Sequence, residues 1–374
     1  MLLTVDTLRA DHLSSYGYAR PTSPHIDALA GAGVRFAQAT ATRGQTWPSL
    51  VSLMTSTLPT VHGVLANGYV FKGQIPTLAE TVRACGYETA AFLTNMLTTP
   101  HPGFELVNTY EQSVGDVEAT RDAIAWLGEK REKPFFLWLH WIGPHAPYAP
   151  SPTNLAPFRD GYDGDLDAEL STLRRIQRER RVLTDAELAH IVALYDGEIA
   201  QVDARIGEVL AALQRTGRFE NSFIVLSADH GEELYDRNFF IGHQMSVYSS
   251  VLRVPLILRG PGVPAGTVVE EVVSLMDVAP TLLALLGIDA PPSFEGRPLL
   301  KRGEMLPAPD FALAQLEPRQ VYSIRTKRWH YIWFPRFAEQ TEGEKRDYPI
   351  AAEELYDLQS DPGERQNVIA SHPG

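Results

Sequence analysis

The sequence predicts an α/β fold with a central, mostly parallel sheet covered by helices on both faces, plus a small antiparallel C-terminal part. Two observations predict it. Short apolar or β-branched runs alternate with amphipathic helical patterns, and this alternation stops after a proline-rich turn near residue 290. We therefore expect a main domain at 1–290 and a C-terminal subdomain at 291–374.

The expected elements follow from hydrophobic spacing. The strands of the main sheet are predicted at Leu2–Val5, Thr89–Leu93, Pro134–Leu139, Ser222–Ser227 and Val254–Leu258. Helical spacing covers Asp27–Ala32, Thr77–Ala84, Val117–Glu129 and Asp185–Arg215. The C-terminal strands are predicted at Val321–Thr326, Trp329–Trp333 and Leu355–Leu358. The segment 150–181 lacks such a pattern and predicts a surface excursion with a solvated basic helix.

Composition excludes several classes of partner. The 374 residues carry 33 Lys and Arg against 46 Asp and Glu, a net charge of −13, which disfavours nucleic acid and anionic membranes. Apolar runs such as Val278–Leu286 are far shorter than the roughly 20 residues that span a bilayer. The lone Cys85 excludes a disulfide framework, and we expect it to be a buried core residue.

Compartment and assembly stay open at this stage. The chain as given starts directly in a predicted strand, without a signal peptide, which points to the cytoplasm. A missing N-terminal segment would instead allow a periplasmic or secreted protein. The aromatic residues Trp329, Tyr331, Trp333 and Phe337 could form an oligomer interface, but strands packed onto the main sheet are the simpler account.

Three polar clusters fall where a parallel sheet places its functional residues, just beyond strand ends. Asp6 ends the first strand, Thr46 precedes a helix expected at Ser49–Thr55, and Asp229-His230 follows the strand at 222–227. Two carboxylates, a hydroxyl and an imidazole suit one divalent cation, with zinc or manganese favoured and calcium as a further candidate. Taken singly, such residues are more often helix caps or turn formers.

The order of these motifs resembles the sulfatase branch of the alkaline phosphatase superfamily. The resemblance is carried by Val5-Asp6-Thr7-Leu8-Arg9-Ala10-Asp11-His12-Leu13, Thr22-Ser23-Pro24-His25-Ile26-Asp27, Gly33-Val34-Arg35-Phe36, Asp229-His230-Gly231-Glu232, Leu252-Arg253-Val254-Pro255 and Glu354-Leu355-Tyr356-Asp357-Leu358 with Asp361, Pro362, Glu364 and Asn367. It implies an alkaline phosphatase-like sandwich with a catalytic domain at 1–290. It also implies that Asp6, Thr46, Asp229 and His230 hold the metal ion.

The sequence departs from this family at the nucleophile. Sulfatases carry Cys or Ser in C/S-x-P-x-R, which is converted to formylglycine, whereas this chain has Thr46-x-Pro48-Ser49-Leu50. A threonine is not expected to give that aldehyde, and Leu50 replaces the accompanying arginine. Threonine nucleophiles resemble those of the superfamily's phosphodiesterases, nucleotide pyrophosphatases and phosphoglycerol or phosphoethanolamine transferases.

The rest of the pocket resembles phosphonate monoester hydrolases and arylsulfatases. His145, in Pro144-His145-Ala146-Pro147, corresponds to the histidine that faces the leaving group and is the expected general acid. His243 lies where many relatives keep a lysine that contacts the anion, and it is a further catalytic candidate: it could donate a hydrogen bond, protonate the leaving group alongside His145, or ligate a second ion. Asn67 and Asn95 fall near positions that hold an anion oxygen, although asparagine is also common in turns. His140 is either a core residue or part of the pocket.

From these residues and the resemblance we expect a metal-dependent hydrolase whose substrate is a small anionic ester, either a phosphate diester or a phosphonate monoester. We expect the reaction to pass through a covalent phosphothreonine. Promiscuity toward sulfate esters is expected. One metal is favoured because Asp196 and Asp203 lack the histidine of a second site and match a helix used for packing and capping. Three alternatives stay open: a sulfuric ester hydrolase without formylglycine, a head-group phosphotransferase, and an inactive binding homologue.

Overall fold

An eight-stranded sheet with the order β10-β2-β9-β6-β1-β5-β3-β4 forms the centre of the computed structural model. The structure describes residues 1–94, 102–112, 115–159, 161–237, 240–244, 246–317, 319–337 and 351–372. The strands are β1 (Leu2–Val5), β2 (Val34–Thr40), β3 (Glu88–Leu93), β4 (Leu106–Thr109), β5 (Phe135–Trp141), β6 (Ile224–Ala228), β9 (Arg253–Arg259) and β10 (Thr267–Ser274). Only β9 runs antiparallel to its neighbours, β2 and β6, within this sheet.

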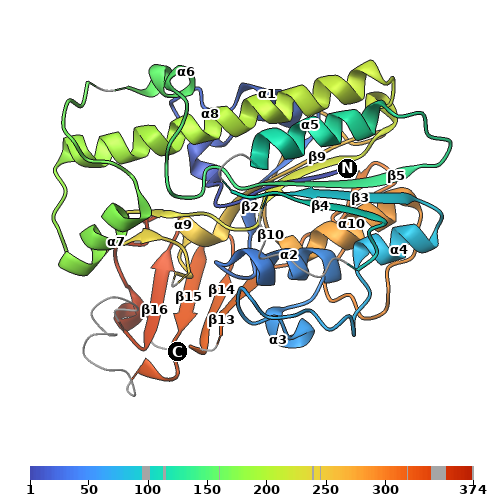
Figure 1. Ribbon diagram of the computed structural model, residues 1–374. Helices are drawn as coiled ribbons and strands as arrows, with labels where there is room; N and C mark the ends of the chain where they lie inside the picture. Colours follow the sequence, from blue (N-terminus) through green and yellow to red (C-terminus); the bar gives the residue numbers. More distant parts are fainter. Residues whose placement is uncertain are drawn as a thin grey trace.

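Helices cover both faces of the sheet, as the alternating pattern predicts. On one face lie α1 (Pro24–Gly31), α5 (Gly115–Gly128) and α8 (Asp185–Arg215), and on the other α2 (Thr46–Thr55), α4 (Leu78–Ala84) and α10 (Val278–Leu286) (Figure 1). Capping boxes begin two of them, Thr77 with Glu80 at α4 and Thr184 with Glu187 at α8. None of the described helices is long and apolar enough to cross a membrane.

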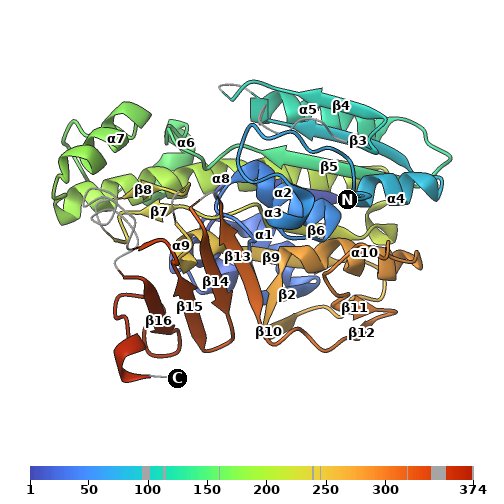
Figure 2. The same cartoon turned by 90° about the horizontal axis from the view of Figure 1, so that it is seen from below.

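A second sheet of four antiparallel strands lies beside β10 and β2 (Figure 2). It contains β13 (Ala312–Leu316), β14 (Val321–Arg325), β15 (Trp329–Trp333) and β16 (Glu353–Asp357). The small hairpins are β7 (Glu233–Leu234) with β8 (Ile241–Gly242), and β11 (Leu300–Lys301) with β12 (Glu304–Met305). The short helices are α3 (Pro59–His62), α6 (Pro152–Leu155), α7 (Leu170–Glu179) and α9 (Ser249–Leu252).

The differences from the predicted elements concern their ends and a few added strands. Helix α2 begins at Thr46, three residues before the predicted start, and β5 continues through His140 and Trp141. Strands β4, β10 and β13 were not predicted from spacing. The expectation for Cys85 was wrong: the thiol follows the last turn of α4 and is exposed, because the packed face of that helix is formed by Leu78, Ala79 and Val82.

Candidate active site

The register of two neighbouring strands, β1 and β6, brings three of the predicted polar residues to one edge of the sheet. Val5 of β1 lies beside Ala228 of β6, so the next residues, Asp6 and Asp229, leave the sheet side by side. His230 follows, and its Nε2 lies 3.4 Å from Asp229 Oδ2 and 3.7 Å from Asp6 Oδ1. All three side chains are fully buried. These three residues are the group of acidic and histidine side chains in the described structure that could hold a metal ion.

Thr46 joins this cluster from the opposite side, at the first turn of α2. Its Oγ1 lies 3.3 Å from Asp6 Oδ2 and 3.5 Å from His230 Nε2. Ser49, one turn further along, donates a hydrogen bond of 2.6 Å to the carbonyl of Asp229. The start of α2 is thereby tied to the strand that precedes two of the candidate ligands, and a helix N-terminus beside the cluster favours negative charge there.

A glycine lets the segment before Thr46 approach the loop that carries His243. A Cβ on Gly44 would lie 2.6 Å from Val251 Cγ1, 3.0 Å from the Ser246 carbonyl and 3.1 Å from the His243 carbonyl. These distances are shorter than normal contacts, and two of the three atoms belong to the backbone. The position of the nucleophile candidate relative to His243 therefore depends on a residue without a side chain.

The charges of the cluster call for a cation. Burial and the neighbouring Asp6 raise the pKa of Asp229 well above its ordinary value. Burial, followed by the nearby His243, lowers the pKa of His230 to about 3, so its ring is neutral. The Nδ1 atom of His230 lies 2.9 Å from the Gly231 carbonyl, which favours a proton there and leaves the Nε2 lone pair facing the carboxylates.

These residues fit a divalent metal ion. The Oδ2 atom of Asp229 is buried and accepts no hydrogen bond from the described residues, and the other donors are a carboxylate, a hydroxyl and a neutral imidazole. Asp6, Thr46, Asp229 and His230 would hold the ion, since oxygen and imidazole nitrogen are ligands for zinc and manganese alike. Without such an ion, two buried carboxylates would lie together with no full counter-charge.

One residue beside Asp6, Thr7, was not assigned a role from the sequence. Thr7 adopts a positive φ of 56°, an unfavourable conformation for a β-branched residue, and its amide donates to Asp229 Oδ1 at 3.3 Å. The Thr7 hydroxyl is buried without a hydrogen-bond partner among the described residues. The position of Thr7 directly after Asp6 was the only signal for it in the sequence.

His140 belongs to the same environment rather than to a satisfied core. Its Nδ1 lies 2.9 Å from Thr4 Oγ1, which also accepts a hydrogen bond from Trp138 Nε1. Its Nε2 is buried, lies 3.8 Å from Asp6 Oδ2, and makes no hydrogen bond with the described part of the chain. Burial alone raises the pKa of Asp6, but the surrounding histidines, His140 first, lower it below its ordinary range.

The turn that carries His145 is held by two carboxylates. Asp116 accepts hydrogen bonds from the amides of Ile142 and Gly143 at 2.9 and 3.1 Å, and Glu198 accepts one from Ala149 at 3.0 Å. His145 itself is half-buried, and its Nδ1 lies 2.6 Å from the Ala146 carbonyl. Its Nε2 is then the atom left to exchange a proton with a substrate.

Glu232 holds His243 beside the cluster. Glu232 is part of the Asp229-His230-Gly231-Glu232 motif, but no role for it was predicted from the sequence. His243 Nδ1 lies 3.0 Å from Glu232 Oε1, and its ring centroid is 4.3 Å from that of His230 and 5.2 Å from that of His145. Burial alone lowers the pKa of His243, but the Glu232 carboxylate outweighs burial and raises it above the ordinary value. His243 is therefore suited to carry a positive charge beside the cluster.

The two asparagine predictions have different outcomes. Asn67 Oδ1 accepts a hydrogen bond of 2.9 Å from the amide of Trp47, so it helps to cap α2 beside Thr46. Its Nδ2 makes no hydrogen bond with the described residues, and its role toward a substrate stays a prediction. Asn95 lies outside the described residues.

The two acidic residues excluded from a second metal site serve the fold instead. Asp196 is fully buried and accepts hydrogen bonds from Tyr18 and Arg20, and it pairs with His12 at 2.8 Å. Asp203 accepts the amides of His25 and Ile26 and so caps α1. Packing and capping are the roles that the sequence predicts for both.

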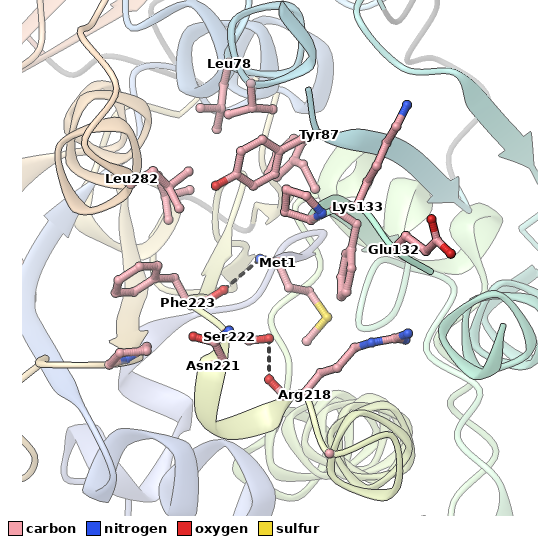
Figure 3. Close-up of a pocket in the computed structure, with 17 residues that line it drawn as sticks. Met1, Leu78, Tyr87, Glu132, Lys133, Arg218, Asn221, Ser222, Phe223 and Leu282 are labelled. Carbon is pink, nitrogen blue, oxygen red and sulfur yellow. Dashed lines mark hydrogen bonds between the residues drawn. The ribbon is translucent and has the colours of Figure 1, made fainter. Parts of the chain in front are cut away.

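The cavity in Figure 3 lies at the other edge of the sheet, where the parallel strands begin. It has a volume of about 460 Å³, and its lining includes Met1, Tyr87, Phe135, Phe223 and Leu282. None of the candidate metal ligands lines it. The cavity is therefore separate from the cluster at the C-terminal ends of the strands.

Comparisons with known proteins agree with the fold and with the ester-cleaving class. A family model described as Sulfatase matches residues 1–288. Arylsulfatase K of Bos taurus is 30% identical over 203 residues, which are 51% of this chain and 35% of that protein. The match thus spans about a third of this relative's length.

Solved structures share the architecture over nearly the whole chain. The phosphonate monoester hydrolase of Agrobacterium radiobacter superposes with a TM-score of 0.79 at 23% identity, covering 99% of this chain and 91% of that one. A protein solved with its substrate D-glucosamine-2-N,6-O-disulfate gives a TM-score of 0.81 at 21% identity, covering 100% and 94%. At these identities the likeness shows the fold alone.

Proposed function

The chain belongs to the sulfatase family, and on that premise we propose that it hydrolyses phosphate diesters or phosphonate monoesters with Thr46 as the nucleophile and one divalent ion. The observation that carries this proposal is the position of the Thr46 hydroxyl, 3.3 Å from Asp6 and 3.5 Å from His230 at the first turn of α2. This is where the resemblance places the Cys or Ser of sulfatases. A threonine there keeps the oxygen nucleophile without the aldehyde.

The charges around Thr46 favour a singly charged substrate. The groups that act electrostatically to lower the pKa of Asp6 are all histidines, namely His140, His145 and His230. With one divalent ion and these imidazoles, and no arginine or lysine among them, the site offers less positive charge than a dianionic monoester asks for. A phosphate diester and a phosphonate monoester each carry a single negative charge and match it better.

The residues support a double displacement. An ion bound by the four candidate ligands would lower the pKa of the Thr46 hydroxyl and offset the charge of a non-bridging oxygen. Thr46 Oγ, which at this lowered pKa releases its proton to solvent, attacks phosphorus, the bond to the leaving oxygen breaks, and His145 protonates that oxygen. The neutral His145 then takes a proton from water, whose oxygen attacks phosphorus. The bond from phosphorus to Thr46 Oγ breaks, which restores the deprotonated Thr46 for the next turnover.

A sulfate ester hydrolase without formylglycine is the second candidate. Family membership favours it, and a sulfate monoester carries the same single charge as a phosphate diester. An inactive binding homologue is disfavoured by the buried Asp6 and Asp229, since a protein that had lost the reaction would gain stability by replacing either carboxylate. A head-group phosphotransferase would differ only in the acceptor, an alcohol in place of water.

Kinetics on matched aryl esters test the proposal. The purified chain, loaded with zinc or manganese, is assayed on an aryl phosphate diester, an aryl phosphonate monoester and an aryl sulfate with the same leaving group. We expect the two phosphorus esters to have the higher kcat/KM and Thr46→Ala to lose turnover on both. A higher kcat/KM for the sulfate would replace this proposal with the second candidate.

A further inference from the structure

A polar pocket lies between the C-terminal sheet and the main domain, and we call it the seam pocket. It has a volume of about 320 Å³, and its lining includes Gln38 of β2, Ser249 of α9, Arg253 of β9, Arg325 of β14, Lys327 and Glu364. In both cartoon views β14 lies next to α9 (Figures 1 and 2). None of Asp6, Thr46, Asp229 and His230 lines this pocket.

Arg325 is a buried cation that makes no direct ion pair with a carboxylate of the described residues. It is only 3% exposed, and it donates to Ser249 Oγ at 2.6 Å and to Gln38 Oε1 at 2.9 Å, both neutral acceptors. Its Nε makes no hydrogen bond within the described residues. Burial lowers the pKa of Arg325 to about 10, Glu364 raises it, and the like charge of Arg253 lowers it further. A guanidinium held in this way has donor capacity to spare.

Two further cations line the same pocket. Arg253 donates from Nε to the Ala37 carbonyl at 3.2 Å, and no carboxylate of the described chain is within ion-pair distance of it. The Nζ atom of Lys327 has a single described ion contact, to Glu271 at 3.9 Å, and both of these side chains are more than half exposed. Such an exposed pair contributes little, so Lys327 stays free to turn toward the pocket.

The acidic residues of the pocket are already engaged elsewhere. Asp11 and Asp236 both bind Arg9, at 2.9 and 2.6 Å. Glu364 lies 2.6 Å from His330 Nδ1, accepts the amide of Ser249 at 2.8 Å and lies 3.6 Å from Arg237. Glu364 and Asp11 offset part of the charge of Arg325 and Arg253, but five Arg and Lys side chains line the pocket with only three carboxylates, in a protein whose net charge is −13.

We propose that the seam pocket binds a small, doubly charged oxyanion, such as inorganic sulfate or phosphate, between Arg253, Arg325 and Lys327. Two guanidinium groups and an ammonium can surround a tetrahedral anion with charge-assisted hydrogen bonds, and a pocket of about 320 Å³ has room for one. This inference does not depend on the reaction proposed for Thr46.

Occupation of the seam pocket would join the two sheets of the molecule. Arg325 and Lys327 belong to the C-terminal sheet and its following turn, whereas Arg253 opens a strand of the main sheet. Ser249, which accepts a hydrogen bond from Arg325, begins α9 shortly after the segment that carries His243. An anion at this place would stabilise the folded chain against separation of these parts.

A crystal soaked in selenate and a sulfate titration test the inference. Selenate is a tetrahedral dianion, and the anomalous signal of selenium locates it. Sulfate is titrated into the full chain in a calorimeter to measure its affinity, and the thermal midpoint is measured with and without sulfate. Both measurements use excess EDTA, which removes the ion from the active site, and a constant ionic strength set with chloride. We expect a selenium peak between Arg253 and Arg325, and sulfate to raise the thermal midpoint.

Variants assign the binding to these residues. Arg253→Gln should weaken sulfate binding about tenfold or more, because one charge-assisted contact is lost, and Lys327→Gln should weaken it less. Lys301→Gln, which removes the same charge from the β11–β12 hairpin, should bind sulfate like the unmodified chain. Arg253 and Lys327 are partly exposed, so both variants should fold, which circular dichroism checks. No selenium peak in the seam pocket, or equal sulfate affinity in Arg253→Gln and Lys301→Gln, would overturn the proposal.

Discussion

Replacing Gly44 by alanine tests how the nucleophile segment is positioned. The added Cβ would lie 2.6 Å from Val251 Cγ1, 3.0 Å from the Ser246 carbonyl and 3.1 Å from the His243 carbonyl. The Val251 methyl can turn aside, but the two carbonyls belong to the backbone, so either the Thr46 segment or the His243 loop must move. Reaching normal contact distances with the two carbonyls takes a shift of a few tenths of an ångström.

A shift of this size should lower both activity and stability. A misplacement of about 1 Å can cost roughly 100-fold in rate, so for a shift of a few tenths of an ångström we expect kcat/KM for an aryl phosphate diester to fall about 4- to 10-fold. Overpacking should lower the free energy of unfolding by about 1–3 kcal/mol, which denaturant titration measures. Gly31→Ala is the control, because a Cβ there meets no atom within 4 Å. If Gly44→Ala kept kcat/KM within threefold of Gly31→Ala, the positioning argument would be refuted.

Three other outcomes follow from the buried charges. Removing the metal ion with a chelator should abolish hydrolysis and lower the thermal midpoint of unfolding, because Asp6 and Asp229 lose their counter-charge. Added zinc or manganese should restore both. If the chelated protein kept its rate and its midpoint, the proposed metal ion would be excluded. His140→Ala should weaken metal binding about 10- to 100-fold in competition with a chelating dye, whereas unchanged affinity would make His140 a packing residue. Burial raises the pKa of Glu198 from 4.5 to about 7. The stability that its neutral form contributes is complete below pH 4.5 and lost as the pH rises through 7. Glu198→Gln should therefore match the unmodified chain in denaturant titrations at pH 4 and exceed it by about 3 kcal/mol at pH 8; an equal free energy of unfolding at pH 8 would contradict this.

The sequence was sufficient to predict the central cluster because strand ends determine it. Asp6 and Asp229 each follow a short apolar run, and parallel strands place such residues at one edge. The helix Asp185–Arg215 was predicted with its observed bounds, since a long amphipathic pattern with a capping box leaves little choice. By contrast, the start of α2 was placed three residues late, because Pro48 is tolerated within the first turn of a helix.

Contacts between distant segments could not be predicted in the same way. The tertiary fold alone brings Glu232 to His243, and Asp116 to the turn before His145. No residue spacing in the sequence indicates either contact. The C-terminal motif was recognised as a motif, but the role of its Glu364 was not. Its contacts with His330 and Ser249 tie the two sheets together across 34 and 115 positions of the chain. Cys85 was misplaced because hydrophobic character alone does not say which side of a helix end faces solvent.

The most direct test of the account is to identify the covalent intermediate. The metal-loaded protein is mixed with an aryl phosphonate monoester, quenched with acid within one turnover, digested, and examined by peptide mass spectrometry. We expect the peptide containing Thr46 to gain the mass of the phosphonyl group, with fragment ions placing it on Thr46, and Thr46→Ala to show no such gain. Full turnover with no modified peptide, or a modification on another residue such as His145, would contradict it.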